Sequence, residues 1–435
     1  MDARTTALSA LIACRRQGAW SDGILKEYVQ RDKLARRDAA LASQLVYGVI
    51  QNRMLLDFYL KQVVTGSLSK LQPAMLDILR LGAYQIVFLD KIPDSAAVNE
   101  AVEQTKRYVN RKASGMTNGA LRALARKKEA LPQPNDLATR YSHPQALVEL
   151  LQESVGQAQI EGLLQADNEP VPTSLQVNTL RSSADEVKAA LTEQEISFEK
   201  HPWLEGCYLV RGTGDLAKLD LFTSGKVYVQ DPSARLAAMA AGVKPGMRVL
   251  DTCAAPGGKS FAAAIAMENE GSITSCDIHA HKIALIEKGA ERLGISIVHA
   301  KQADASQCYE EFENGFDVVI ADVPCSGLGV IRKKPDIRYK DLAPLERLPA
   351  VQAAILENVS RYVRPGGALL YSTCTVLKRE NEQVAEAFLA HHPEFSLETF
   401  NVPEKLCTEN CGMLTLLPSL HAADGFFICK LRKRV

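Results

Sequence analysis

The sequence predicts an α/β chain with an all-helical front, a small α+β segment in the middle and a doubly wound sheet at the back. Three observations predict this order. Apolar residues recur at helical spacing up to about residue 130, strand-like and helix-like stretches mix between 141 and 230, and strands alternate with helices from about 231 onward. At 435 residues the chain is too long for one hydrophobic core. We therefore expect three domains, over residues 1–135, 141–230 and 231–435.

The front segment is predicted to be helical because its apolar residues are spaced by three or four. In RRDAALASQLVYGVIQNRMLLDFYL, Leu41, Leu45, Val46 and Val49 follow this spacing, and PAMLDILRLGAYQIVFL repeats it. The prolines of LPQP then break the last helix, which sets the first boundary. In the middle segment, SLQVNTL and KVYVQDP have the composition of strands, and SADEVKAALTEQEI has that of a capped helix.

Charge is distributed unevenly along a chain whose formal net charge is zero. Residues 1–140 carry 22 lysines and arginines against 13 aspartates and glutamates, a net charge of +9, and the remainder balances this with −9. A basic front half attached to an acidic back half suggests that the front meets a polyanion such as a nucleic acid. The alternative interpretation is a solvated helical surface with a chance excess of charge.

Composition also excludes several classes of protein. No run of about 18 apolar residues exists, so no membrane span is expected. The ten cysteines include no C-x-x-C pair, which argues against a zinc site or a disulfide framework. We therefore expect a cytoplasmic protein with reduced thiols and no metal. Nothing requires a dimer, so a monomer is expected.

A glycine-rich turn between a strand and a helix predicts a nucleoside-binding site. VLDTCAAPGGKS places Gly257 and Gly258 directly after an apolar strand, and Asp277 ends the next strand 19 residues beyond Gly258. A phosphate-binding P-loop is excluded because its first glycine position holds Cys253, and the dinucleotide motif G-x-G-x-x-G is absent. Acids at successive strand ends, with Asp304 after the third strand, suit S-adenosyl-L-methionine. The competing interpretation is that these acids only cap helices.

Two later strands end in cysteine-bearing loops. ADVPCSG brings Asp322 and Cys325, and YSTCT brings Cys374. Two thiols and a carboxylate beside a methyl donor suggest attack on a pyrimidine: a thiolate adds to C6 of cytosine, and C5 then becomes nucleophilic enough to accept a methyl group. The thiolate is the reactive form, and the base must be unstacked to be reached. Local sequence does not decide which cysteine attacks, and each alone is as well explained as a buried structural thiol.

These motifs resemble those of the RNA cytosine-5 methyltransferases, a family with a Rossmann-like class I methyltransferase domain. DTCAAPGGKS, CDIHAHK, DVPCSGLGVIRKKPDIRY, YSTCTVLKRENE and DGFFICKL carry the resemblance. It implies that Cys374 is the nucleophile, that Cys325 assists product release, and that Asp322 acts beside them. It also implies a cofactor site formed by Asp277, Asp304, Asp322 and the loop Cys253, Ala254, Ala255, Pro256, Gly257, Gly258 and Lys259. Alternatively, Lys259 could contact the target base or an RNA phosphate.

The front half narrows the resemblance. RRDAALASQLVYGVIQNRMLLDFYL, LRLGAYQIVFLDKIPDSAAVNEAVE and NGALRAL are similar to the helical RNA-binding domain of the NusB family. Fusion of that domain to this catalytic module implies methylation of one cytosine of 16S ribosomal RNA, at position 967 in the usual numbering. The basic stretch VIRKKPDIRYK is expected to lie close to that base, with Arg332, Lys333 and Lys334 on RNA phosphates. The alternatives are methylation of tRNA or another RNA, and a non-catalytic ribosome assembly factor.

Overall fold

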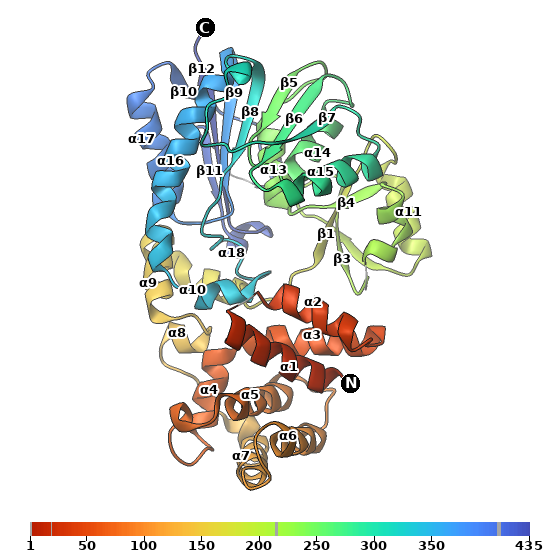
Figure 1. Ribbon diagram of the computed structural model, residues 1–435, viewed down its shortest axis with the longest axis vertical. Coiled ribbons are helices and arrows are strands. Elements are labelled where there is room, and N and C mark those ends of the chain that lie inside the picture. Colours follow the sequence, from red (N-terminus) through yellow and green to blue (C-terminus); the bar gives the residue numbers. More distant parts are fainter. Residues whose placement is uncertain (1, 19, 214–215, 407–409) are drawn as a thin grey trace. The chain divides into compact units, whose positions relative to one another are not determined.

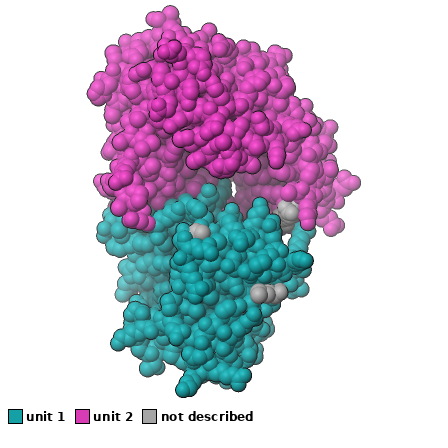
Figure 2. Space-filling view, viewed as in Figure 1, with its two compact units in different colours: residues 1–152, 160–168, 333–340 teal, residues 153–159, 169–332, 341–435 magenta. Residues whose placement is uncertain are grey.

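The computed structural model describes all residues except 1, 19, 214–215 and 407–409. The chain divides into two compact units, coloured separately in Figure 2. The first unit contains residues 1–152, 160–168 and 333–340, and the second contains 153–159, 169–332 and 341–435.

The first unit is helical, as its apolar spacing predicts. It contains α1 (Ala3–Gln17), α2 (Ser21–Arg31), α3 (Arg36–Gln51), α4 (Arg53–Lys61), α5 (Pro73–Phe88), α6 (Asp94–Tyr108), α7 (Ser114–Lys127), α8 (Leu137–Arg140) and most of α9 (Gln145–Val155) and α10 (Gln157–Ala166). Helix α1 begins because the Asp2 carboxylate accepts hydrogen bonds from the backbone N–H groups of Arg4 and Thr5. Leu45, Val46 and Val49 of α3 are buried in one continuous core.

The first unit does not end at residue 135. Helices α8 to α10 extend it to Asn168, and it also includes the distant segment 333–340, which forms the short helix η5 (Pro335–Tyr339). The buried side chain of Arg338 holds this segment: its Nη1 donates to the carbonyl of Gln51 at 2.8 Å, and its Nη2 donates to that of Asp167 at 3.2 Å. These bonds join segments far apart in sequence, so the compact unit is discontinuous along the chain.

The second unit begins with a small α+β domain. Its sheet has the order β2-β3-β1-β4, with every neighbouring pair antiparallel. The elements are β1 (Thr173–Val177), α11 (Ala184–Glu193), β2 (Ser197–Lys200), β3 (Cys207–Arg211), α12 (Asp220–Thr223) and β4 (Val227–Val229). Helix α11 starts with a capping box in which Ser183 and Glu186 bond to each other's backbone N–H.

The remainder of the second unit is built on a sheet of order β10-β12-β9-β8-β5-β6-β7, with β11 paired to β12. Its strands are β5 (Arg248–Asp251), β6 (Ser272–Asp277), β7 (Val298–Gln302), β8 (Phe316–Asp322), β9 (Val363–Thr373), β10 (Phe395–Leu397), β11 (Met413–Leu416) and β12 (Phe426–Lys433). Strands β5 to β9 are parallel, whereas β12 runs antiparallel to β9. The sheet is thus mixed rather than purely parallel, because β12 returns from β11 without a crossover helix.

Helices cover both faces of this sheet, which confirms the doubly wound arrangement (Figure 1). They are α13 (Pro232–Ala240), α14 (Gly258–Ala266) and α15 (Ala280–Leu293) on one face, α16 (Leu348–Val359) and α17 (Glu382–His391) on the other, and the short α18 (Pro418–His421). Val318 and Ile320 of β8 point into the first layer, whereas Val319 and Ala321 point into the second. The strand order reverses between β5 and β8, and ligands bind at such switch points.

Over the described residues, none of the helices is both long enough and apolar enough to cross a membrane.

Candidate active site

The glycine-rich loop follows β5 at the switch point. Gly257 has φ +110°, a conformation that favours glycine, and a Cβ at this position would collide with the ring of Phe261. The backbone N–H of Ala254 donates to the carbonyl of Cys276 at 2.7 Å, which fixes the loop against β6. Burial raises the pKa of Cys253 to about 12, so this thiol lines the loop without ionising near neutral pH. The chain thus brings the predicted loop to the carboxyl end of β5, at the switch point of the sheet.

Beneath the loop lies a carboxyl group to which sequence reasoning assigned no role. Asp251 is fully buried at the end of β5, and the hydroxyl of Ser260 donates to its Oδ2 at 2.7 Å. Burial raises the pKa of Asp251 to about 7, and its Oδ1 has no hydrogen-bond partner in the part of the chain that the structure describes. Asp251 could have been identified from the sequence as an acid that ends an apolar strand. Its hydrogen bond with Ser260 tethers the first turn of α14 to β5.

The predicted cofactor acids lie at the neighbouring strand ends, Asp277 at the end of β6 and Asp304 just after β7. Oδ1 of Asp277 accepts the backbone N–H of His279 at 3.0 Å and lies 3.6 Å from Nζ of Lys282. Oδ1 of Asp304 accepts the backbone N–H of Ser306 at 2.9 Å. Both acids therefore shape the turns that follow their strands, but neither accepts the N-terminal hydrogen bond that would cap the next helix, which begins after His279 and after Tyr309. These contacts use only Oδ1, so the second acceptor oxygen of each carboxylate is not engaged by them.

Asp322 links the cofactor loop to both cysteine-bearing strands. Its Oδ2 lies 2.6 Å from Nζ of Lys259, and its Oδ1 accepts the hydroxyl of Ser372 at 2.8 Å. The Lys259 side chain is buried, and its Nζ also lies 4.9 Å from the centre of the Phe426 ring. The sequence left the role of Lys259 open, and in the structure its partner is Asp322. The ion pair holds the Asp322 carboxylate at the end of β8.

The two cysteines meet at this edge of the sheet. Cys325 lies in the loop after β8, Cys374 follows β9 directly, and their Sγ atoms are 3.2 Å apart. The hydrogen bond to Cys374 raises the pKa of the Cys325 thiol well above its usual value, and burial and the charges of Cys374 and Glu380 act in the same direction. The raised pKa favours the protonated form of Cys325, whose Sγ lies within hydrogen-bond distance of the Cys374 sulfur.

A buried clamp that the sequence did not reveal holds the Cys325 loop. Oε2 of Glu380, a fully buried residue, accepts the backbone N–H of Ser326 at 2.9 Å and Nε2 of Gln352 at 2.9 Å. The same Nε2 of Gln352 donates to the carbonyl of Pro324 at 3.0 Å. The backbone on both sides of Cys325 is thus fixed. Glu380 stands in the charged stretch KRENE, where no local signal shows which acid is buried.

The predicted basic stretch is divided between the two units. Arg332 belongs to the second unit, and its Nε lies 2.7 Å from Asp424 while its Nη2 lies 3.8 Å from Asp231. A phosphate at Arg332 would compete with these two carboxylates. Lys333 and Lys334 are exposed and belong to the first unit. Their contacts with RNA remain predictions.

Metal-ligating groups do not gather in this site. Among the residues that the structure describes, no cluster of three or more histidine, cysteine, aspartate or glutamate side chains has an arrangement that could hold a metal ion.

Three family models match the chain in the order of its domains. They are the NusB family over residues 1–126, an RsmF/B-like, ferredoxin-like domain over 143–216, and 16S rRNA methyltransferase RsmB/F over 238–432. The first two correspond to the helical unit and the small antiparallel sheet, and the third corresponds to the sheet that carries both cysteines.

Full-length relatives agree with these models. A probable ribosomal RNA small subunit methyltransferase B of Bacillus subtilis (strain 168) is 39% identical over 444 aligned residues, which cover 99% of this chain and 98% of the relative. A ribosomal RNA small subunit methyltransferase B of Klebsiella pneumoniae is 32% identical and covers 93% of this chain and 92% of its own. A crystal structure of a methyltransferase homologue from Pyrococcus horikoshii superposes with a TM-score of 0.59 at 25% identity, over 68% of this chain and 98% of that one.

Proposed function

Because this chain belongs to the ribosomal RNA small subunit methyltransferase B family, we propose that it methylates C5 of one cytosine of 16S ribosomal RNA, position 967 in the usual numbering. The observation that carries the proposal is the pair of sulfur atoms 3.2 Å apart, on Cys325 and Cys374, at the ends of neighbouring strands. A protein that only bound RNA would need neither thiol. The cytoplasm as its location and a monomeric state remain predictions.

The loop from Cys253 to Lys259 and the acids Asp277 and Asp304 suit S-adenosyl-L-methionine. Gly257 leaves no room for a side chain where the loop meets Phe261, so ligand and backbone can approach closely. Asp277 and Asp304 each keep an acceptor oxygen for the hydroxyl and amino groups of a nucleoside. When bound, the cofactor supplies an electrophilic methyl group.

Cys374 supplies the nucleophile in the proposed mechanism. Its thiolate forms a bond to C6 of the flipped-out cytosine, and the electron pair of the C5–C6 double bond moves toward C5 and N3. As charge develops, N3 takes up a proton from solvent, and the carboxylate of Asp322, held between Lys259 and Ser372 in the same site, accepts a hydrogen bond from the resulting N3–H. C5 then accepts the methyl group and becomes tetrahedral, still bearing its proton.

Cys325 then completes the reaction. The C5 proton must leave to a base, and the electron pair it leaves re-forms the C5–C6 double bond and expels the sulfur of Cys374. Once Cys374 is bonded to carbon, its sulfur no longer carries the charge that raises the pKa of Cys325. Cys325 can then release its proton to solvent, and the resulting thiolate accepts the proton from C5. The same coupling that keeps Cys325 protonated at the start therefore releases it at the required step.

The test is methyl transfer to 16S rRNA that lacks the modification, with 5-methylcytosine mapped by bisulfite sequencing. We expect one new methylated cytosine, at position 967, that is absent with Cys374→Ala. Methylation of total tRNA but not of 16S rRNA would keep the chemistry and overturn the substrate. Tight RNA binding without methyl transfer to any RNA would favour an assembly factor.

A further inference from the structure

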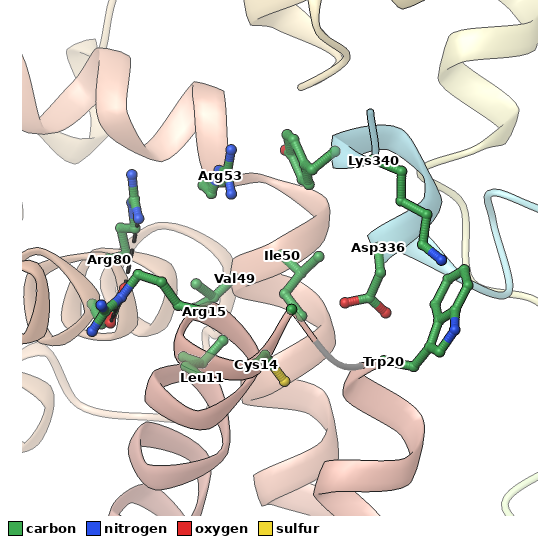
Figure 3. Close-up of a pocket in the computed structure, with 13 residues that line it drawn as sticks. Leu11, Cys14, Arg15, Trp20, Val49, Ile50, Arg53, Arg80, Asp336 and Lys340 are labelled. Carbon is green, nitrogen blue, oxygen red and sulfur yellow. Dashed lines mark hydrogen bonds and ion pairs between the residues drawn. The ribbon is translucent and has the colours of Figure 1, made fainter. Parts of the chain in front are cut away.

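The helical unit contains a cavity that the methylation chemistry does not use. Its volume is about 290 Å³, near the lower limit for pockets that bind small molecules. Residues of α1, α3, α4, α5 and η5 line it, and all of them belong to the first unit. Figure 3 shows an apolar floor around Ile50, with three arginines on one side and Asp336, Lys340 and Trp20 on the other.

One wall of the cavity is fixed from behind. This wall is η5, and Arg338 holds it through the carbonyl bonds described above and a third bond, from Nη1 to Oδ1 of Asn168 at 2.9 Å. The hydroxyl of Tyr339 donates to the carbonyl of Ser142 at 3.1 Å, and that of Ser21 donates to Asp336 at 2.5 Å. The cavity is therefore preformed, which lowers the entropy lost when a ligand binds.

The three arginines of the cavity differ in whether they form ion pairs with acids. Arg15 and Arg80 lie 3.0 and 3.6 Å from the carboxylate of Asp77. The guanidinium of Arg53 instead stacks 3.8 Å from the centre of the Tyr339 ring and makes no ion pair with an acid among the described residues. Because Arg53 is exposed, its donors can reach a ligand anion.

An aromatic ring and an acid complete the site on the opposite side. Trp20 is 43% exposed, and Nζ of Lys340 lies 3.0 Å from the centre of its ring. Lys340 covers one face of the ring, so a planar base would stack on the opposite face, as bases do on aromatic rings in proteins that bind single-stranded nucleic acid. The carboxylate of Asp336 can accept a hydrogen bond from an exocyclic amino group, as carboxylates do from cytosine N4. A cation, a flat aromatic ring and an acceptor are the three groups that a nucleotide requires.

We propose that this cavity binds one nucleotide of an RNA strand, with the phosphate at Arg53, the base on Trp20 and an amino group of the base at Asp336. The chemistry favours cytidine, adenosine or guanosine over uridine, because uracil has no exocyclic amino group. The proposal rests on the proposed function only in taking RNA as the source of the nucleotide. Binding here requires no methyl transfer, so the two proposals can fail separately.

The first experiment measures the fluorescence of Trp20 in the full-length protein. The sequence contains only two tryptophans, and the other, Trp203, is buried in the second unit, so Trp20→Phe is a direct control. We titrate cytidine monophosphate, uridine monophosphate, cytidine and inorganic phosphate. We expect saturable quenching by cytidine monophosphate, at least several-fold weaker binding of the uridine form, and loss of this preference in Asp336→Ala, which removes the acceptor. No saturable response, or equal binding of inorganic phosphate alone, would overturn the assignment.

The second experiment tests RNA as the source. Arg53→Ala should weaken binding of cytidine monophosphate about tenfold or more, because a charge-assisted hydrogen bond is lost. It should also reduce the slope of log affinity for 16S rRNA fragments against log salt by about one. Arg122→Ala, which removes the same charge from an exposed position on α7, should leave mononucleotide binding unchanged. Arg53→Lys, which keeps the charge, controls for folding.

Each result of the second experiment supports or overturns the assignment of the cavity to a nucleotide of RNA. Competition by 16S rRNA fragments for the Trp20 signal supports the assignment. Mononucleotide binding that RNA fragments do not displace would show a site for free nucleotides and overturn it. An equal loss of mononucleotide affinity in Arg53→Ala and Arg122→Ala would reduce the effect to general electrostatics and also overturn it. Methyl transfer measured on the same samples reports separately on the proposed function.

Discussion

Cys325 and Cys374 follow neighbouring strands of one sheet, yet adjacent residues of one segment hold them differently. Glu380, a buried carboxylate, fixes the backbone after Cys325 through the N–H of Ser326. Asn381, a buried neutral amide, fixes the loop at Cys374: its Oδ1 accepts the hydroxyl of Thr373 at 2.6 Å, and its Nδ2 donates to the carbonyl of Thr375 at 3.0 Å. A negative charge beside Cys325 opposes its ionisation, whereas a neutral amide beside Cys374 does not. The comparison teaches that cysteines at two neighbouring strand ends can have their backbones held by groups of different charge.

The largest expected effect is the loss of methyl transfer when the proposed nucleophile, Cys374, is removed. Cys374→Ala should lower methyl transfer by at least about 10⁴-fold, the scale of loss when an enzyme nucleophile is removed. It should also form no covalent adduct with 16S rRNA on a denaturing gel. Cys308→Ala, which removes an exposed thiol, is the matched control and should retain activity. Adduct formation by Cys374→Ala would reverse the two roles.

The next effect concerns Cys325, the partner that keeps its proton. Cys325→Ala should permit attack and methylation but block release, so multiple turnover should fall by about 10²–10⁴-fold. Enzyme and RNA should remain bonded on a denaturing gel, and the adduct should contain the transferred methyl group, which labelled cofactor would reveal. Rapid turnover without an accumulated adduct would show that another group removes the C5 proton.

Asp322→Asn tests whether the two strand ends act as one site. The substitution leaves the buried Lys259 ammonium without its carboxylate partner, and we expect a loss of about 2–3 kcal/mol in the free energy of unfolding. Single-turnover methylation should fall about 10²-fold, because the group at N3 is lost. Denaturant unfolding and rapid quench measure the two effects. Unchanged stability would mean that the Lys259–Asp322 pair is not formed as described.

The smallest effect sharpens the comparison without removing a reacting group. Glu380→Gln keeps an acceptor for Ser326 but removes the charge that raises the pKa of Cys325. That pKa should therefore fall, and the limb of the pH–rate profile that reports loss of the Cys325 proton should move to lower pH, by up to about one unit. Glu386→Gln, an exposed substitution on α17, makes the same charge change away from the clamp. A shift to higher pH in Glu380→Gln would contradict the proposed role of the carboxylate.

The elements that bear the chemistry could be predicted from sequence, because each obeys a local rule. Asp277, Asp322 and Cys374 stand at the ends of apolar strands, and parallel strands bring their ends together. The clamp could not be predicted, since Glu380 bonds to Ser326, 54 residues away, and its sequence neighbours are also charged. The burial of Arg338 could not be predicted either, for a similar reason. RKKPDIRYK has the composition of an exposed loop, yet carbonyls distant in sequence surround Arg338.

The burial of Arg338 bears on the order in which the protein can fold as it is synthesised. Segments 1–152 and 160–168 of the helical unit leave the ribosome first, but the segment that completes this unit ends at residue 340. At about 5–20 residues per second, roughly 10–35 s separate residue 168 from residue 340. During that interval the carbonyls of Gln51 and Asp167 lack the guanidinium that they later bind. The nascent helical unit therefore stays incomplete until segment 333–340 has been synthesised. Translation of residues 169–340 thus sets the earliest time at which the helical unit can become fully native.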